Sequence, residues 1–154
     1  GHLNNPSKEC VCSPGQITKY QRKISGPLLD RIDIFIEVPQ VEIRKIDEES
    51  EDAAEAEKIR ERVERARVMQ RERCENGPLF TNAEMGLREI KKYCPLADAS
   101  RTVLNQAYER FGLSARAYYR LVKIARTIAD LEESKNIEVK HISEALQYRA
   151  RQEV

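Results

Sequence analysis

Arg31 stands where a guanidinium could reach a phosphate. A turn at residues 25–27 leads into a short apolar segment, and Arg31 directly precedes residues 32–38, in which every second residue is Ile or Val. That alternation is typical of a strand, so the pattern predicts an arginine at the rim of a sheet. A guanidinium matches phosphate oxygens with its fork of donors. The flanking Asp30 and Asp33 leave a second interpretation open, because an exposed ion pair would use the same residues and contribute little.

A second group of cations follows Ser114, which is a good N-cap for a helix. Arg116, Arg120 and Lys123 fall within one narrow arc at about 100° per residue. Arg116 lies in the first turn, where free backbone N–H groups and the helix dipole favour an anion. The spacing therefore predicts a helix that offers a row of positive charge. From spacing alone, an ordinary amphipathic helix with solvated arginines is the preferred interpretation.

Cys10 and Cys12 form a C-x-C pair in a segment that is expected to be a loop. Two thiolates cannot complete a structural zinc site, which needs four ligands. His2 is a further candidate ligand. For this chain taken alone, two unpaired cysteines near the start of the sequence are the simpler interpretation.

The sequence lacks the parts that grip a nucleotide. It contains no G-x-x-x-x-G-K-[ST] phosphate loop and no hydrophobic strand ending in paired acids that could hold magnesium. The chain begins abruptly, and we expect it to be part of a longer protein. If an ATPase is involved, its phosphate-binding half lies outside these residues. The chain alone is then expected to be catalytically inactive and to bind no cofactor.

Composition sets further bounds. The chain has 154 residues, of which 34% are charged and none is Trp, so it can form one domain, or a small domain carrying a fragment of another. The formal net charge of +1 argues against a general polyanion binder. No apolar run approaches the roughly 20 residues of a membrane span, and the first residues do not resemble a signal peptide. We therefore expect a cytoplasmic protein whose four cysteines are not disulfide-bonded.

The expected elements divide the chain near residue 45. Residues 1–45 are expected to be the end of an α/β domain, with a helix after Ser13, one helical turn near residues 28–31 and the strand at 32–38. Residues 46–154 are expected to be a helical bundle. Its predicted helices span about 52–74, 82–92, 98–111 with Gly112 closing it, 115–133 and 141–149.

Two segments resemble one family in the correct order. Residues 24–38, Ile-Ser-Gly-Pro-Leu-Leu-Asp-Arg-Ile-Asp-Ile-Phe-Ile-Glu-Val, resemble the arginine-finger segment of the magnesium chelatase-like branch of AAA+ ATPases. Residues 113–120, Leu-Ser-Ala-Arg-Ala-Tyr-Tyr-Arg, resemble the sensor 2 segment of that branch. Nearly the whole chain is similar to the C-terminal part of YifB/ComM-like members. The resemblance implies a mainly α fold: the helical lid bundle of an AAA+ ATPase, preceded by a short α/β remnant of the ATPase core.

The resemblance also implies roles for individual residues. Arg31 would be the arginine finger that reaches the ATP of a neighbouring subunit. Arg116 would be the sensor 2 arginine at the γ-phosphate, with Arg120 as a further candidate. Cys10 and Cys12 would be half of a Zn²⁺ site completed by a second C-x-C upstream. ATP and Mg²⁺ are the cofactors implied for the complete protein.

The partners implied by the family are the N-terminal ATPase core, other copies of the protein in a ring, expected to be a hexamer, and DNA that is remodelled or undergoes branch migration. No membrane partner is implied. Three alternatives stay open: a helical protein-interaction module, a direct DNA-binding domain using the row of cations, and the motor subunit of a porphyrin metal chelatase. The near-neutral net charge counts against direct DNA binding.

Overall fold

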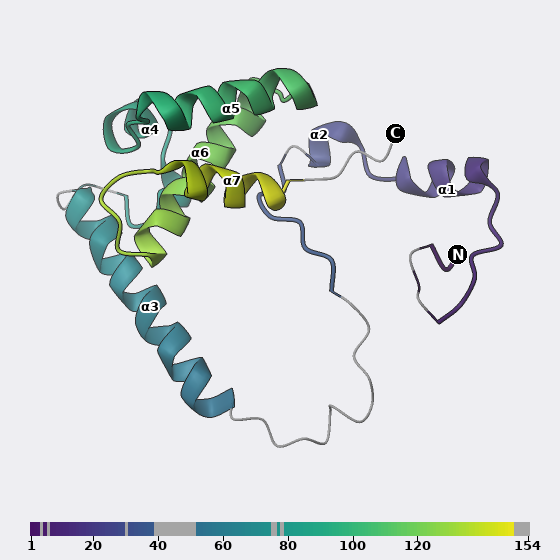
Figure 1. Cartoon of the computed structure of the whole chain (residues 1–154), viewed down its shortest axis with the longest axis horizontal. Helices are drawn as coiled ribbons and strands as arrows, with labels where there is room; N and C mark the ends of the chain where they lie inside the picture. The colour runs from purple at the N-terminus through teal and green to yellow at the C-terminus, as the bar shows by residue number, and fades with distance from the viewer. Residues whose placement is uncertain are drawn as a thin grey trace. The chain divides into compact units, whose positions relative to one another are not determined.

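The computed structural model describes residues 1–3, 5, 7–29, 31–38, 52–74, 77 and 79–149. The chain forms two compact units, Gly1–Ile32 and Asp33–Val154. The helices of both units are labelled in Figure 1.

The first unit contains two short helices. Helix α1 spans Pro14–Gln21 and begins as predicted, because Ser13 and Gln16 form a capping box. The backbone N–H of Ser13 donates to Gln16 Oε1 at 2.8 Å, and the backbone N–H of Gln16 donates to Ser13 Oγ at 3.4 Å. Helix α2 is a single turn, Gly26–Leu29. None of the described residues of this unit is buried, so the unit has no hydrophobic core among them.

The strand predicted at residues 32–38 is not formed. These residues are irregular, and the β-pairing found among the described residues is one isolated parallel bridge between Leu96 and Ile137. One backbone bond holds the segment inside the second unit, where the N–H of Phe35 donates to the carbonyl of Tyr148 at 2.9 Å. Residues with this alternation become a strand only when a neighbouring strand supplies backbone partners. Among the described residues, no strand lies beside this segment.

The second unit is helical, and most of its predicted helices are confirmed. It contains α3 (Asp52–Arg73), the short 3₁₀ helix η2 (Asn82–Glu84), α4 (Leu87–Tyr93), α5 (Asp98–Phe111), α6 (Ala115–Leu131) and α7 (Val139–Gln147). Gly112 ends α5 in the left-handed conformation with φ 57°. That conformation suits glycine at a helix C-terminus.

Two predicted boundaries are wrong. The single helix expected over 82–92 is two helices, because Met85 and Gly86 are extended between η2 and α4. The last helix begins at Val139 rather than His141. Glu138 is its N-cap residue, and its backbone N–H donates to Nδ1 of His141 at 2.9 Å. His141 is thus part of the cap in the first turn.

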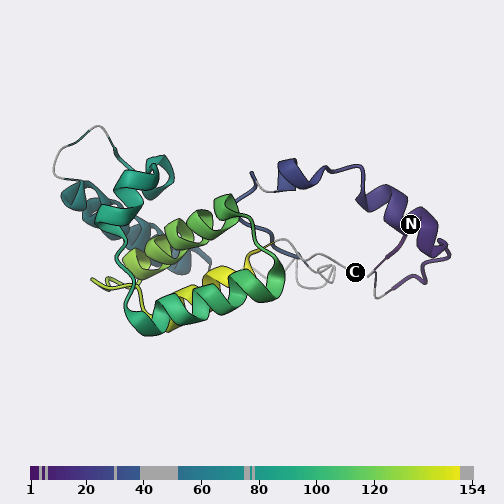
Figure 2. The same cartoon turned by 90° about the horizontal axis from the view of Figure 1, so that it is seen from above.

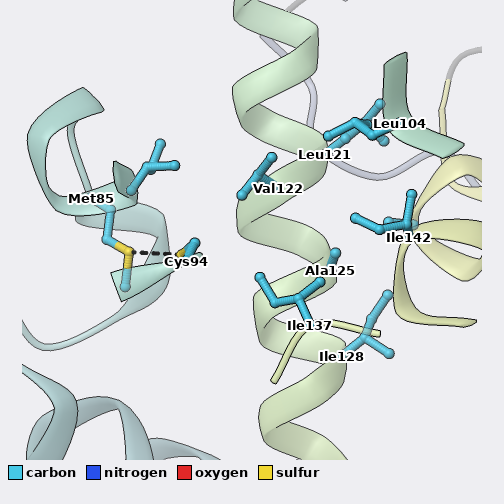
Figure 3. Packing of buried hydrophobic residues seen from close by; sticks show 11 residues of the cluster. Met85, Cys94, Leu104, Leu121, Val122, Ala125, Ile128, Ile137 and Ile142 are labelled. Carbon is cyan, nitrogen blue, oxygen red and sulfur yellow. Dashed lines mark hydrogen bonds between the residues drawn. The ribbon is translucent and has the colours of Figure 1, made fainter. Parts of the chain in front are cut away.

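Helix α6 is the centre of the second unit and packs against α3, η2, α4 and α7. Figure 2 shows α7 beside both α5 and α6. The close-up in Figure 3 shows side chains from α6 facing those of α5, α7 and the segment before α7. The aliphatic residues at this centre, each less than 8% exposed, are Leu104, Leu121, Val122, Ala125, Ile128, Ile137 and Ile142. Burial of such side chains is the main favourable contribution to folding.

A buried carboxylate lies at the C-terminal end of α6. Asp130 is fully buried and accepts a hydrogen bond from Nε of Arg126 at 3.0 Å. Arg73, near the end of α3, donates to both carboxylate oxygens, with Nη1 at 3.0 Å from Oδ2. Asn82 of η2 donates to Oδ2 through Nδ2 at 2.8 Å. One side chain therefore joins α3, η2 and α6.

The same network shapes the turn that follows α6. Glu133 has a positive φ of 56°, a conformation that is unfavourable for a residue other than glycine. Arg126 is 1% exposed and donates from its two terminal nitrogens to the carbonyls of Ser134 and Lys135. Burial lowers the pKa of the Arg126 guanidinium, and the charge of Asp130 opposes this shift. The arginine thus stabilises both the carboxylate and the reversed backbone.

We predict that Asp130→Ala lowers the free energy of unfolding by about 3 to 5 kcal/mol, because it leaves two largely buried guanidinium groups without their counter-charge. Urea unfolding followed by circular dichroism measures this. Glu109→Ala, on the exposed side of α5, is the control and should change stability by less than about 0.5 kcal/mol. A loss below about 1 kcal/mol for Asp130→Ala would show that the network is dispensable.

Candidate functional site

The site predicted from the sequence centres on the first turn of α6. Ser114 caps this helix, and its Oγ accepts a hydrogen bond from the backbone N–H of Ala117 at 3.1 Å. Arg116 is the second residue of the helix, and its side chain is exposed. None of the described residues forms a hydrogen bond or an ion pair with its guanidinium. A cation without a partner among the described residues therefore lies at the positive end of a helix dipole, which is a suitable place for an anionic ligand.

The predicted row of three solvated cations on α6 is wrong. Arg120 keeps only 11% of its side chain exposed, and its Nε lies 3.9 Å from Oδ1 of Asp33. Lys123 is half-buried, and its Nζ donates to the carbonyl of Ala83 at 3.0 Å. The polar side of the helix is therefore used for contacts within the domain. Of these three cations, Arg116 alone is exposed, so α6 presents no continuous basic stripe to DNA.

Arg31 is also exposed and belongs to the first unit. Its backbone N–H donates to the carbonyl of Leu28 at 2.9 Å, which closes the turn after α2. No described residue pairs with its guanidinium. Because Arg116 lies in the other unit, the prediction that both arginines serve ATP hydrolysis stays a prediction.

Cys10 and Cys12 are half-buried free thiols in the first unit. Hydrogen bonds from the backbone of Cys12 and then of His2 lower the pKa of the Cys10 thiol, which favours the thiolate that metals and electrophiles require. Within the described part of the chain, no three His, Cys, Asp or Glu residues are grouped to hold a metal ion. The two cysteines thus supply at most half of a zinc site, and that assignment stays a prediction.

Arg126 and Asp130 were missed by the sequence reasoning. The two residues are four positions apart in α6, and their neighbours in the sequence include the apolar residues Val122, Ala125 and Ala129. A charged pair placed inside an apolar stripe is the signal that could have identified them, because buried charges occur almost always in pairs. Their role is structural: the network fixes the C-terminal half of the helix whose first turn carries Arg116.

One open groove runs along α3 and holds a volume of about 460 Å³. Its lining combines two apolar residues, Val68 and Met69, with four charged ones, Glu61, Glu64, Arg65 and Glu133. None of the predicted site residues lines it. Within the described residues, no helix is long and apolar enough to cross a membrane.

Sequence comparison assigns the class of protein. Residues 53–149, which include all of α4 to α7, match the family described as "Magnesium chelatase, subunit ChlI C-terminal". Residues 1–46 match the family described as "Magnesium chelatase, subunit ChlI". The chain therefore belongs to the magnesium chelatase-like proteins, and its residues 53–149 match the C-terminal part of that family.

The similar curated proteins are bacterial. The chain is 40% identical over 138 residues to "Competence protein ComM" of Haemophilus influenzae, a match covering 90% of this chain and 26% of that protein. It is 36% identical over 139 residues to "Uncharacterized protein YifB" of Salmonella typhimurium and 34% identical to YifB of Escherichia coli, in each case over 90% of this chain and 27% of the relative. The chain thus spans about a quarter of the length of these relatives.

The thiols should differ in reactivity. Burial raises the pKa of the Cys94 thiol to about 11, whereas backbone hydrogen bonds lower that of Cys10. Because the thiolate is the nucleophile, we predict that iodoacetamide at pH 8 alkylates Cys10 first and Cys94 last. Peptide mass spectrometry over a time course measures the order. Denatured chain is the control, since unfolding should equalise the rates; equal rates in the folded chain would contradict the prediction.

Proposed function

We propose that this chain is the C-terminal part of a magnesium chelatase-like AAA+ ATPase and that it supplies two arginines to ATP hydrolysis. The observation that carries the proposal is Arg116, an exposed guanidinium in the first turn of the capped helix α6. In this assignment residues 46–154 are the helical lid, and residues 1–45 are the end of the ATPase core. The core itself, with ATP and Mg²⁺, would come from sequence that precedes this chain.

Arg116 acts as sensor 2. A guanidinium donates to two phosphate oxygens at once and keeps its charge at any physiological pH. The first turn of α6 adds backbone N–H groups of its own, which favour the same anion. The lid can then sense the γ-phosphate, because the buried network and the aliphatic core fix α6 within the helical unit.

Arg31 acts as the arginine finger in a ring of identical subunits. Its guanidinium would reach the ATP of the neighbouring subunit and stabilise charge that develops on the γ-phosphate in the transition state. In other phosphoryl-transfer systems such an arginine changes the rate by about 10³ to 10⁵. Its exposure and its lack of a partner among the described residues are consistent with this role.

Two processes are candidates for the one that ATP hydrolysis drives. The 40% identity to a protein named as a competence protein favours the remodelling or branch migration of DNA. The match of both segments to magnesium chelatase families favours a motor for metal insertion into a porphyrin. The two differ in what stimulates hydrolysis: branched DNA in the first case, and the remaining subunits of a chelatase in the second. Because Arg120 and Lys123 make contacts within the domain, the cations of α6 do not support a DNA contact on that helix.

In the full-length protein, we predict that Arg116→Ala weakens ATP binding about 10- to 100-fold, the effect of losing a hydrogen bond to a charged group. The loss should be much smaller for ADP, which has no γ-phosphate. Titration calorimetry with both nucleotides measures this. Arg62→Ala on α3 is the matched control, since Arg62 is exposed and lies on a helix without predicted site residues. Equal ATP affinity in the wild type and Arg116→Ala would contradict the sensor 2 role.

For Arg31→Ala we predict loss of hydrolysis with ATP binding nearly unchanged. The decisive measurement mixes Arg31→Ala subunits with subunits that lack the phosphate-loop lysine. If the finger acts across the subunit boundary, some interfaces join an intact loop to an intact arginine, and mixed rings regain activity. Absence of recovery in rings verified as mixed by mass spectrometry would exclude a finger that acts in trans.

A further inference from the structure

We propose that Arg120 is a positioning residue: its ion pair with Asp33 attaches the segment that follows the arginine finger to the helix that carries sensor 2. This inference rests on the proposed function. Asp33 is two residues after Arg31 in the chain, and Arg120 is one turn after Arg116 in α6. The pair lies within the second unit and joins two residues that are close in sequence to the proposed ATPase arginines.

The burial of Arg120 supports a structural use of its charge. Only 11% of its side chain is exposed, whereas 59% of the Asp33 side chain is exposed. A guanidinium in a largely desolvated position requires an acceptor or a counter-charge nearby. Asp33 supplies one at 3.9 Å and is not the only group with which Arg120 interacts. A cation held in this way is a poor candidate for a second phosphate ligand, because binding a phosphate would mean leaving these partners.

A second contact holds the same segment. The backbone N–H of Phe35 donates to the carbonyl of Tyr148, the residue that ends α7. Phe35 is half-buried, while Ile34 and Ile36 are 52% and 71% exposed. Asp33 and Phe35 are two residues apart, and each contacts the helical part of the unit, Asp33 through its carboxylate and Phe35 through its backbone N–H.

The two arginines of α6 therefore differ in function. The guanidinium of Arg116 has no partner among the described residues, whereas Arg120, four residues later, contacts Asp33, which follows the finger by two residues in the sequence. Loss of Arg120 should then reduce the rate of hydrolysis without weakening ATP binding, because misplacement of a catalytic group by about 1 Å can cost about 100-fold in rate.

The anchor is tested first in this chain without nucleotide. Arg120→Met retains much of the apolar stem and removes the charge, and Asp33→Asn removes the partner charge. Each should speed amide hydrogen exchange at Phe35 about two- to fivefold, the range expected for an ion pair with one exposed partner, as measured by NMR. The charge-reversed pair Asp33→Arg with Arg120→Asp should return the rate toward that of the wild type. Arg62→Met, a solvated arginine on α3, is the matched control and should leave exchange at Phe35 unchanged.

The positioning role is tested in the full-length ATPase. Arg120→Met should lower kcat at least about tenfold with the affinity for ATP within about twofold of the wild type, and the charge-reversed pair should recover part of kcat. Unchanged exchange at Phe35, unchanged kcat, or weakened ATP binding in Arg120→Met would each overturn the inference. A wild-type protein without ATPase activity would instead refute the proposed function, and exchange at Phe35 would still decide whether the anchor exists.

Discussion

The architecture of the helical unit depends on one carboxylate. Asp130 is fully buried and lies between the guanidinium groups of Arg73 and Arg126. A charge in such a place is tolerated only when the groups around it satisfy it completely, and the described residues leave no buried side-chain nitrogen or oxygen without a hydrogen-bond partner. Burial of aliphatic side chains stabilises the unit, but it is not directional. These hydrogen bonds are directional, so they orient the helices relative to one another. The network therefore defines how α3, η2 and α6 meet.

The two ends of α6 have different roles. The C-terminal end is fixed by buried charge, the middle forms the aliphatic core, and the first turn presents a guanidinium to solvent. The N-cap at Ser114 and the left-handed Gly112 before it define where the helix starts. A ligand that binds at the first turn would therefore meet a helix that is already in place. The conformational entropy of this side of the site is already lost on folding, so binding does not have to order it again, which favours tight binding.

Local signals in the sequence predicted the helices well. The cap at Ser13, the glycine at 112 and the long charged helix after residue 51 all follow from rules that involve neighbouring residues. The prediction of a strand at 32–38 was wrong because strand formation requires partner strands that the local sequence does not specify. The buried pair Arg126 and Asp130 was missed because charged residues are usually solvated, and their burial depends on tertiary contacts. The same reason explains Arg120, which spacing alone placed on a solvated face.

Helix α3 extends beyond the part that the rest of the unit holds. Its described side chains from Ala54 to Arg65 are all exposed, and burial begins at Ala66. Arg73, near its other end, joins the Asp130 network. Such a helix can act as a lever: its last two turns are packed against the unit, and the exposed part before Ala66 is about 20 Å long at 1.5 Å per residue. A rotation of roughly 10° about the packed turns would move the tip by about 3 to 4 Å, by the same geometry. Small adjustments around the buried carboxylate would therefore be amplified at the N-terminal end of α3.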